Sequence, residues 1–240
     1  MKTLVTNNEI ELVGEYLIYK YITEYQKRYP KSVDIEGFIT EFLHLTIVYT
    51  TIADGDLDKV GFTSDGSYPL KVHENGTVVE KVYPKGTVVI DNYLLRTDKS
   101  GRRRFTLAHE AAHVIFERMS PSAPGPCFNR GFDKDQNYTA TELHERLNFC
   151  EVQTDRLASV LLMPRFLVEE VMKKYRNGAP IPLYANSVMR KQDKLSVQKM
   201  ADILGVSYTA FMTRLKHLHL VEHRNMEEYL ALEMNFGGNA

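Results

Sequence analysis

The chain has 240 residues, of which 43% are apolar and 25% charged, a composition typical of a globular protein with one substantial core or one domain plus a small appendage. Its 14 glycines, two cysteines and apolar fraction exclude collagen-like, disulfide-framework and strongly disordered proteins. Thirty basic and 31 acidic residues give a net charge of -1, so the chain as a whole is not attracted to nucleic acid or anionic membranes.

The sequence also predicts a protein that is not exported. Residues 1–15 carry several acidic side chains and no apolar stretch that ends in small residues, unlike a secretion signal. The longest apolar runs, such as residues 157–164, are far shorter than the roughly 20 residues of a membrane span. Two cysteines, Cys127 and Cys150, fit a reducing compartment in which thiols stay free. We therefore expect a cytoplasmic protein without a membrane partner.

Helices and then short strands are predicted for the first part of the chain. Apolar residues at helical spacing indicate an amphipathic helix at residues 8–29, which ends at Pro30, and a second helix at residues 33–45. Between residues 45 and 91, short apolar and β-branched runs alternate with turn residues. This pattern indicates a small antiparallel meander of four or five strands.

Helical periodicity returns at residues 105–118 and again at residues 141–163. Between them, residues 119–138 contain three prolines and few apolar residues, so we expect an exposed loop there. Short helices are predicted beyond residue 164, at residues 165–176, 187–193, 196–204 and 207–217.

The most specific motif lies in the helix predicted at residues 105–118. Residues 109–113 read His-Glu-Ala-Ala-His, and histidines four apart lie on one helix face, one turn from each other. Their imidazoles can therefore share one Zn²⁺ ion, with Glu110 beside them as the base that takes a proton from the activated water. The alternative is a pair of surface histidines. Chance gives this pattern in about 2% of chains of this composition, so the metal site needs support from a third ligand.

The next long helix offers that third ligand. Glu151 and Asp155 are four residues apart and share a helix face, and the remainder of this helix is apolar. Glu151 would join His109 and His113 on the metal and leave the fourth coordination position open. Asp155 would accept a hydrogen bond from a ligand imidazole and fix its orientation. The alternative is an ordinary solvated pair of acids.

Two segments carry a resemblance to a known family. They are residues 103–113, RRFTLAHEAAH, and residues 151–164, EVQTDRLASVLLMP. Together they resemble the ImmA/IrrE family of metallo-endopeptidases, and the resemblance extends over residues 30–220. Thr154 stands where that family usually has alanine, and residues 111–112 replace an Ile/Leu-Gly pair. Neither departure touches a proposed ligand.

The resemblance implies a zinc-dependent endopeptidase of gluzincin type. In bacteria and their mobile elements, such proteins relieve repression by cutting a helix-turn-helix repressor, so the expected partner is a protein substrate of that kind. Hydrolysis also needs a group that stabilises the oxyanion. Tyr138 and His144 are candidates for that role or for contact with the substrate, although a surface position is the favoured interpretation of each.

Residues 196–216 have the pattern of a helix-turn-helix, in which Gly205 makes the turn and Ser207 caps the second helix. The side chains that could contact DNA in such a unit are Tyr208, Thr209, Thr213, Arg214 and Lys216. The segment is only modestly basic and has no basic arm, which argues against DNA contact. We favour helices that pack on the peptidase or grip its substrate.

These observations predict an α+β fold with N-terminal helices, a small antiparallel or mixed sheet, a zinc-binding helix, a glutamate helix and a C-terminal segment resembling a helix-turn-helix. Residues 1–180 are assigned to the metallopeptidase domain, residues 181–222 to the helical segment packed on it and residues 223–240 to a tail. The predicted function is zinc-dependent hydrolysis of a peptide bond in a protein. The alternatives are a DNA-binding regulator and a structural zinc protein without significant proteolysis.

Overall fold

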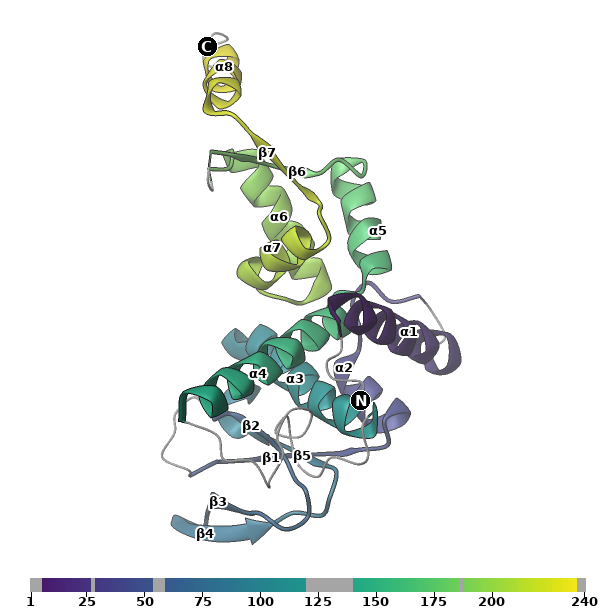
Figure 1. The fold of residues 1–240 in the computed structure, drawn as a ribbon, viewed down its shortest axis with the longest axis vertical. Coiled ribbons are helices and arrows are strands. Elements are labelled where there is room, and N and C mark those ends of the chain that lie inside the picture. Colours follow the sequence, from purple (N-terminus) through teal and green to yellow (C-terminus); the bar gives the residue numbers. More distant parts are fainter. Residues whose placement is uncertain (1–5, 27–28, 54–58, 120–139, 186–187, 237–240) are drawn as a thin grey trace. The chain divides into compact units, whose positions relative to one another are not determined.

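The computed structural model describes residues 6–26, 29–53, 59–119, 140–185 and 188–236, with only the backbone described at 140–150 and 232–236 (Figure 1). The chain forms two compact units, Met1–Pro164 and Arg165–Ala240. Helices and small sheets of two or three strands make it an α+β protein, which confirms the predicted class. Among the described helices, each is too short or too polar to cross a membrane.

The first helix, α1 (Asn7–Tyr25), begins with a capping box. The Thr6 side chain accepts a hydrogen bond from the Glu9 backbone N–H at 3.2 Å, and the Glu9 carboxylate accepts one from the Thr6 N–H at 2.8 Å. The helix therefore starts where the sequence predicts, but it ends four residues earlier than expected.

The next segment differs from the single helix predicted at residues 33–45. A short helix, α2 (Ile35–Gly37), leads into a π-helical turn, η1 (Phe38–Phe42). The wider turn brings its two phenylalanine rings within 5.3 Å of each other, and Phe38 packs edge-on against Tyr21 of α1 at 5.5 Å. Packing of aromatic rings against α1 accounts for the departure from a regular helix here.

The sheet of the first unit has the strand order β1 (Thr46–Thr50), β5 (Thr87–Asp91), β2 (Gly61–Thr63). β1 runs parallel and β2 antiparallel to the central β5. Along the chain, two further strands lie between β2 and β5. They are β3 (Pro69–Glu74) and β4 (Thr77–Val82), which form a separate hairpin. The sheet is thus mixed, one of the two predicted alternatives. The prediction of a continuous antiparallel meander is wrong, because β1 and β5 pair in parallel. A parallel pair needs a crossover connection, which the periodicity of the strands does not reveal.

Two long helices follow the sheet along the chain, after the short helices η2 (Asn92–Leu95) and η3 (Thr97–Lys99). They are α3 (Ser100–Met119) and α4 (Ala140–Leu162), which lie side by side and pack against each other (Figure 1). α4 also packs against α1. α4 agrees within one residue with the helix predicted at residues 141–163, whereas α3 begins five residues before the range predicted at residues 105–118.

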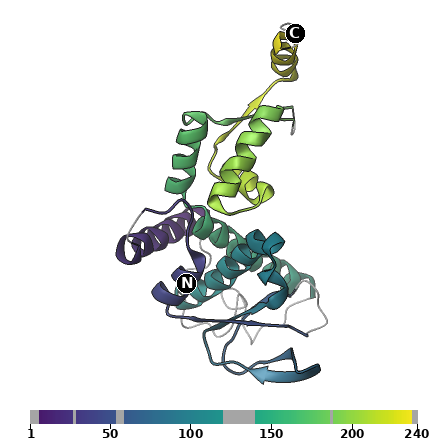
Figure 2. The same cartoon turned by 180° about the vertical axis from the view of Figure 1, so that it is seen from behind.

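The sheet separates these helices from the hairpin, as Figure 1 and Figure 2 show from opposite sides. The four residues from Thr87 to Ile90 in β5 are all buried. Val89 packs with Leu70 and Val72 of the hairpin. Val88 and Ile90 point to the opposite face of the strand, toward the helices. β5 therefore forms the centre of a layered core, and β2 lies at its edge beside α3.

The second unit consists of α5 (Arg165–Arg176), β6 (Ile181–Tyr184), α6 (Lys191–Leu204), α7 (Tyr208–His217), β7 (Val221–Arg224) and α8 (Met226–Phe236). Gly205 ends α6 in the left-handed conformation with φ of 69°, and the Ser207 side chain caps α7 by accepting from the Ala210 N–H. Both details of the predicted turn are confirmed. Helix α8 occupies most of the segment expected as a tail.

The boundary between the compact units falls at Pro164, so α5 belongs with the second unit. The sequence instead assigns residues up to 180 to the peptidase domain. It also indicates only a break at the prolines near residue 180. The structure has β6 there, paired in parallel with β7, and Pro182 lies within this strand. The predicted division into functional domains stays a prediction.

Candidate metal centre

Helix α3 is held in the core along the side that carries its small residues. Ala108, Ala111 and Ala112 are fully buried, and Val114 and Ile115 are nearly so. Small side chains let a neighbouring helix approach closely, and α4 packs along α3 (Figure 1). This contact brings the acidic residues of α4 beside the two histidines of α3.

The three proposed ligands meet where α3 and α4 pack together. The Nε2 atoms of His109 and His113 are 2.9 Å apart. Glu151 places Oε2 at 3.2 Å from His109 Nε2 and Oε1 at 3.9 Å from His113 Nε2. One ligand atom from each residue lies within 4.8 Å of the other two. Two imidazole nitrogens and a carboxylate aimed at one point form a donor set that fits a divalent metal such as zinc.

Asp155 lies on the far side of the His109 ring. Its Oδ1 is 2.9 Å from His109 Nδ1, so this nitrogen can donate a hydrogen bond to the carboxylate. A proton held on Nδ1 leaves the lone pair of Nε2 directed toward Glu151 and His113. The structure thus places Asp155 where it can orient a ligand imidazole.

Charge interactions set the protonation of this cluster. Burial by itself lowers the pKa of His109, but the hydrogen bonds with Asp155 and Glu151 outweigh it and raise the pKa to about 10. The hydrogen bond from His109 in turn holds the pKa of Glu151 below its usual value. Without a metal, the positive charge of protonated His109 therefore offsets one of the two negative charges of Glu151 and Asp155.

Glu110, next to His109 on α3, contacts strand β2. It is only 7% exposed, and burial raises the pKa of its carboxyl group, against the opposing effects of a hydrogen bond from Thr63 and the charge of His109. The Thr63 hydroxyl donates to Glu110 Oε2 at 2.7 Å. A carboxylate that is both buried and hydrogen-bonded, beside two ligand histidines, is suited to move a proton.

A glycine on β2 makes room for this carboxylate. A Cβ atom on Gly61 would lie 2.8 Å from Glu110 Oε1 and 2.5 Å from Thr106 Cγ2, closer than such contacts allow. Sequence reasoning missed Gly61 and Thr63, since they lie far from the histidine motif along the chain. The one signal was a glycine inside a predicted strand, which often marks a close approach.

The remaining candidates cannot be placed beside the centre. Tyr138 lies outside the described residues, and His144 lies on α4 at a position where only the backbone is described. Their proposed roles stay predictions. Arg214 is one of the side chains that could contact a DNA phosphate if the segment bound DNA. It is fully buried in the second unit, so it is not available for such a contact there.

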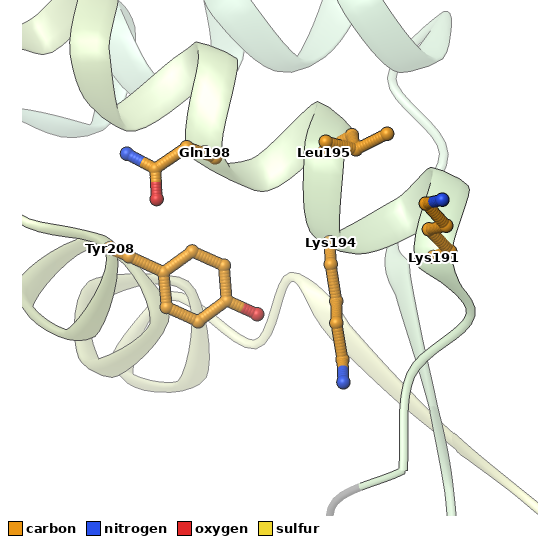
Figure 3. A pocket seen from close by; sticks show the side chains of 5 residues that line it. All are labelled: Lys191, Lys194, Leu195, Gln198 and Tyr208. Atoms are coloured by element: carbon orange, nitrogen blue, oxygen red, sulfur yellow. The ribbon is translucent and has the colours of Figure 1, made fainter.

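A separate hollow lies in the second unit. It has a volume of about 500 Å³ and is lined by Lys191, Lys194, Leu195 and Gln198 of α6 and by Tyr208 of α7 (Figure 3). Its lining contains no histidine and no acidic residue, so it offers neither a metal-ligand set nor a general base of the kind seen between α3 and α4.

The chain is similar to a known protein family over most of its length. Residues 45–216 match the family described as Peptidase_M78, IrrE N-terminal-like domain. No curated protein matches the chain. A solved structure of a Mycobacterium tuberculosis transcriptional regulator matches 87% of this chain at 14% identity with a TM-score of 0.45, and the match spans 47% of that chain. The family match covers more than two thirds of the 240 residues and includes the whole metal centre, which confirms the ImmA/IrrE resemblance: this chain belongs to the IrrE N-terminal-like family of M78 peptidases.

Proposed function

We propose that this protein is a zinc-dependent endopeptidase that cuts a protein substrate. The observation that carries the proposal is the arrangement of one carboxylate and two imidazoles around a common point, with the buried Glu110 next to them. Zinc is favoured because catalytic zinc sites of peptidases use two histidine nitrogens and one carboxylate oxygen, with the fourth position left for water. Membership of the M78 peptidase family supports the same chemistry.

His109, His113 and Glu151 would hold the ion, which when bound supplies a Lewis acid that activates water and polarises a carbonyl group. Asp155 keeps the His109 ring turned so that Nε2 faces the site. Glu110 accepts a proton from the attacking water and then delivers it to the nitrogen of the leaving amine.

The edge of the sheet favours an extended peptide as the substrate. Among the described strands, β2 pairs only with β5, and β2 carries the residues that contact Glu110. An edge strand offers unpaired backbone groups to which an extended chain can add. A peptide placed there would present its backbone next to the proposed base.

The resemblance to ImmA/IrrE peptidases suggests the class of protein that is cut. We take the substrate to be a transcriptional repressor of the helix-turn-helix type, whose cleavage would relieve repression. Such a substrate acts inside the cell, so this proposal places the peptidase in the cytoplasm.

Replacement of Glu110 tests the proposal. Coexpression with candidate helix-turn-helix repressors is expected to give repressor fragments, and Glu110→Gln is expected to reduce cleavage by about 10²- to 10⁴-fold while the protein retains zinc. Fragments are read by gel and mass spectrometry, and zinc by elemental analysis. Glu117→Gln is the matched control, because Glu117 lies on the same helix but pairs at the surface with Lys85.

The alternatives give different results in the same experiment. A DNA-binding regulator would keep its regulatory effect with Glu110→Gln. A structural zinc protein would give no Glu110-dependent fragment, and its main response to Glu151→Gln would be unfolding. Either result would contradict the proposed peptidase.

A further inference from the structure

Strand β2 is fixed opposite the proposed base. Thr63 pairs with Val88 in the sheet, and Gly61 pairs with Ile90. Backbone hydrogen bonds to the β5 segment lie at both ends of the strand, from Ser64 N to Thr87 O and from Asp91 N to Val60 O, each at 2.9 Å. The backbone that carries the Thr63 hydroxyl is therefore held by the central strand of the core.

The hydroxyl and the carboxylate meet in a tightly packed place. Residues 61 and 63 lie on the same face of β2 because side chains alternate along a strand. Gly61 lets the Glu110 side chain come close to the strand, and Thr63 donates to its Oε2 at 2.7 Å. Threonine is stiff about its first side-chain torsion, so it holds its hydroxyl in a narrow range of directions. The Glu110 side chain has three such torsions, so its carboxylate is held in one position only if a neighbouring group restrains it.

We propose that Thr63 is a positioning residue for Glu110, which rests on the proposed peptidase function. Its hydroxyl fixes Oε2 and leaves Oε1 as the acceptor of the proton. When an O–H bond of the attacking water breaks, the proton forms a new O–H bond at Glu110 Oε1 and later passes to the leaving nitrogen. Thr63 keeps its own proton throughout and remains a donor.

A simpler role for the same contact is to satisfy a buried carboxylate and so stabilise the fold. That role predicts a loss of stability with Thr63→Val but no loss of turnover in the folded enzyme. A positioning role predicts a loss of kcat, because misplacement of a catalytic group by about 1 Å can cost on the order of a hundredfold in rate.

The first experiment tests the contact without reference to activity or metal. Chelator-treated wild type, Thr63→Val, Glu110→Met and the double variant are unfolded in urea, and the midpoints are compared. We expect the double variant to lose less than the sum of the two single losses, since each single change already removes the hydrogen bond. Additive losses would contradict the contact.

The second experiment tests positioning in the zinc-loaded enzyme. Thr63→Val is expected to lower kcat by about tenfold to a hundredfold with KM and zinc content nearly unchanged. Thr63→Ser keeps the hydroxyl and is expected to recover most of the loss. Thr46→Val, at an exposed position of β1, is the matched control.

The outcomes separate this inference from the function on which it rests. A wild-type kcat for Thr63→Val, or an equal loss for Thr63→Ser, would overturn the positioning role and leave the peptidase standing. If wild type gave no Glu110-dependent cleavage, the proposed function would fail and the positioning role with it.

Discussion

His109 is the residue whose chemistry depends most on its neighbours. It contacts His113 and Glu151 through one ring nitrogen and Asp155 through the other. The two carboxylates raise the pKa of this imidazole to about 10 in spite of its burial. At neutral pH the His109 ring of the metal-free protein is therefore protonated on both nitrogens and positively charged. Metal binding needs the neutral ring, with one nitrogen free of a proton.

Zinc binding is accordingly expected to release about one proton at pH 7.5, because that pH lies below the pKa of His109. The apparent affinity should rise by about tenfold per pH unit up to pH 9, as the proton competes less well. Calorimetry in buffers of different ionisation enthalpy measures the released proton. Asp155→Asn removes the negative charge of one of the two hydrogen-bonded carboxylates that raise the pKa of His109, and should reduce the release. Binding heats that are equal in all buffers would contradict this prediction.

Sequence reasoning reached part of the centre at this scale. His109, Glu110 and His113 were found because helical spacing is local and repeats every turn, and the structure brings His109 and His113 together with Glu151. Thr63 could not be found in the same way. A lone threonine on a strand has no pattern, and its partner is fixed only by the pairing of β2 with β5.

At the scale of elements, α1 supports the helix that carries Glu151. Gly14 lies where α1 crosses α4, and a Cβ atom there would be 2.6 Å from Val160 Cγ1 and 3.1 Å from Leu157 Cδ1. An ion pair between Glu11 and Arg156, at 3.3 Å, joins the same two helices. The absence of a side chain at Gly14 thus permits close packing of the helices.

Gly14→Ala tests which of two opposing effects on the stability of the protein is larger. Helix propensity alone predicts that alanine stabilises α1 by up to about 1 kcal/mol. The contact with Val160 predicts a net loss of about 1–3 kcal/mol, as for other overpacked cores. We expect the loss to prevail, and Val160→Ala to recover part of it in the double variant by making room. Urea unfolding measures both. A more stable Gly14→Ala protein would contradict the close packing.

Helices were predictable because each leaves a periodic pattern in its own residues. Strand pairing was not, since β1 and β5 are separated along the chain by the hairpin and pair in parallel. The π-helical turn at Phe38–Phe42 also escaped prediction, because its cause is the packing of aromatic rings against Tyr21 of another helix.

At the scale of the whole molecule, each of the two compact units has its own buried core. In the second unit, Asp193 is only 1% exposed and pairs with Arg176 and, at 2.9 Å, with Arg190. These contacts join the end of α5 to the start of α6. The metal centre, in contrast, belongs wholly to the first unit.

Asp193→Ala is therefore expected to reduce the stability of the second unit by about 3–5 kcal/mol, because it leaves two arginines without their buried partner. Zinc content should stay at the wild-type level, as all three proposed ligands lie in the first unit. Thermal unfolding and elemental analysis measure the two effects. Asp202→Ala, at an exposed position of α6, is the control and should cost less than about 1 kcal/mol. Equal losses for the two variants would contradict the buried network.

Two of the three proposed ligand residues come from α3 and the third from α4, and the intervening chain runs from residue 114 to 150. An ion held by all three would act as a removable cross-link that closes this long loop. Supply or withdrawal of the metal would then govern catalysis and the cohesion of these two helices together, with no covalent bond made or broken.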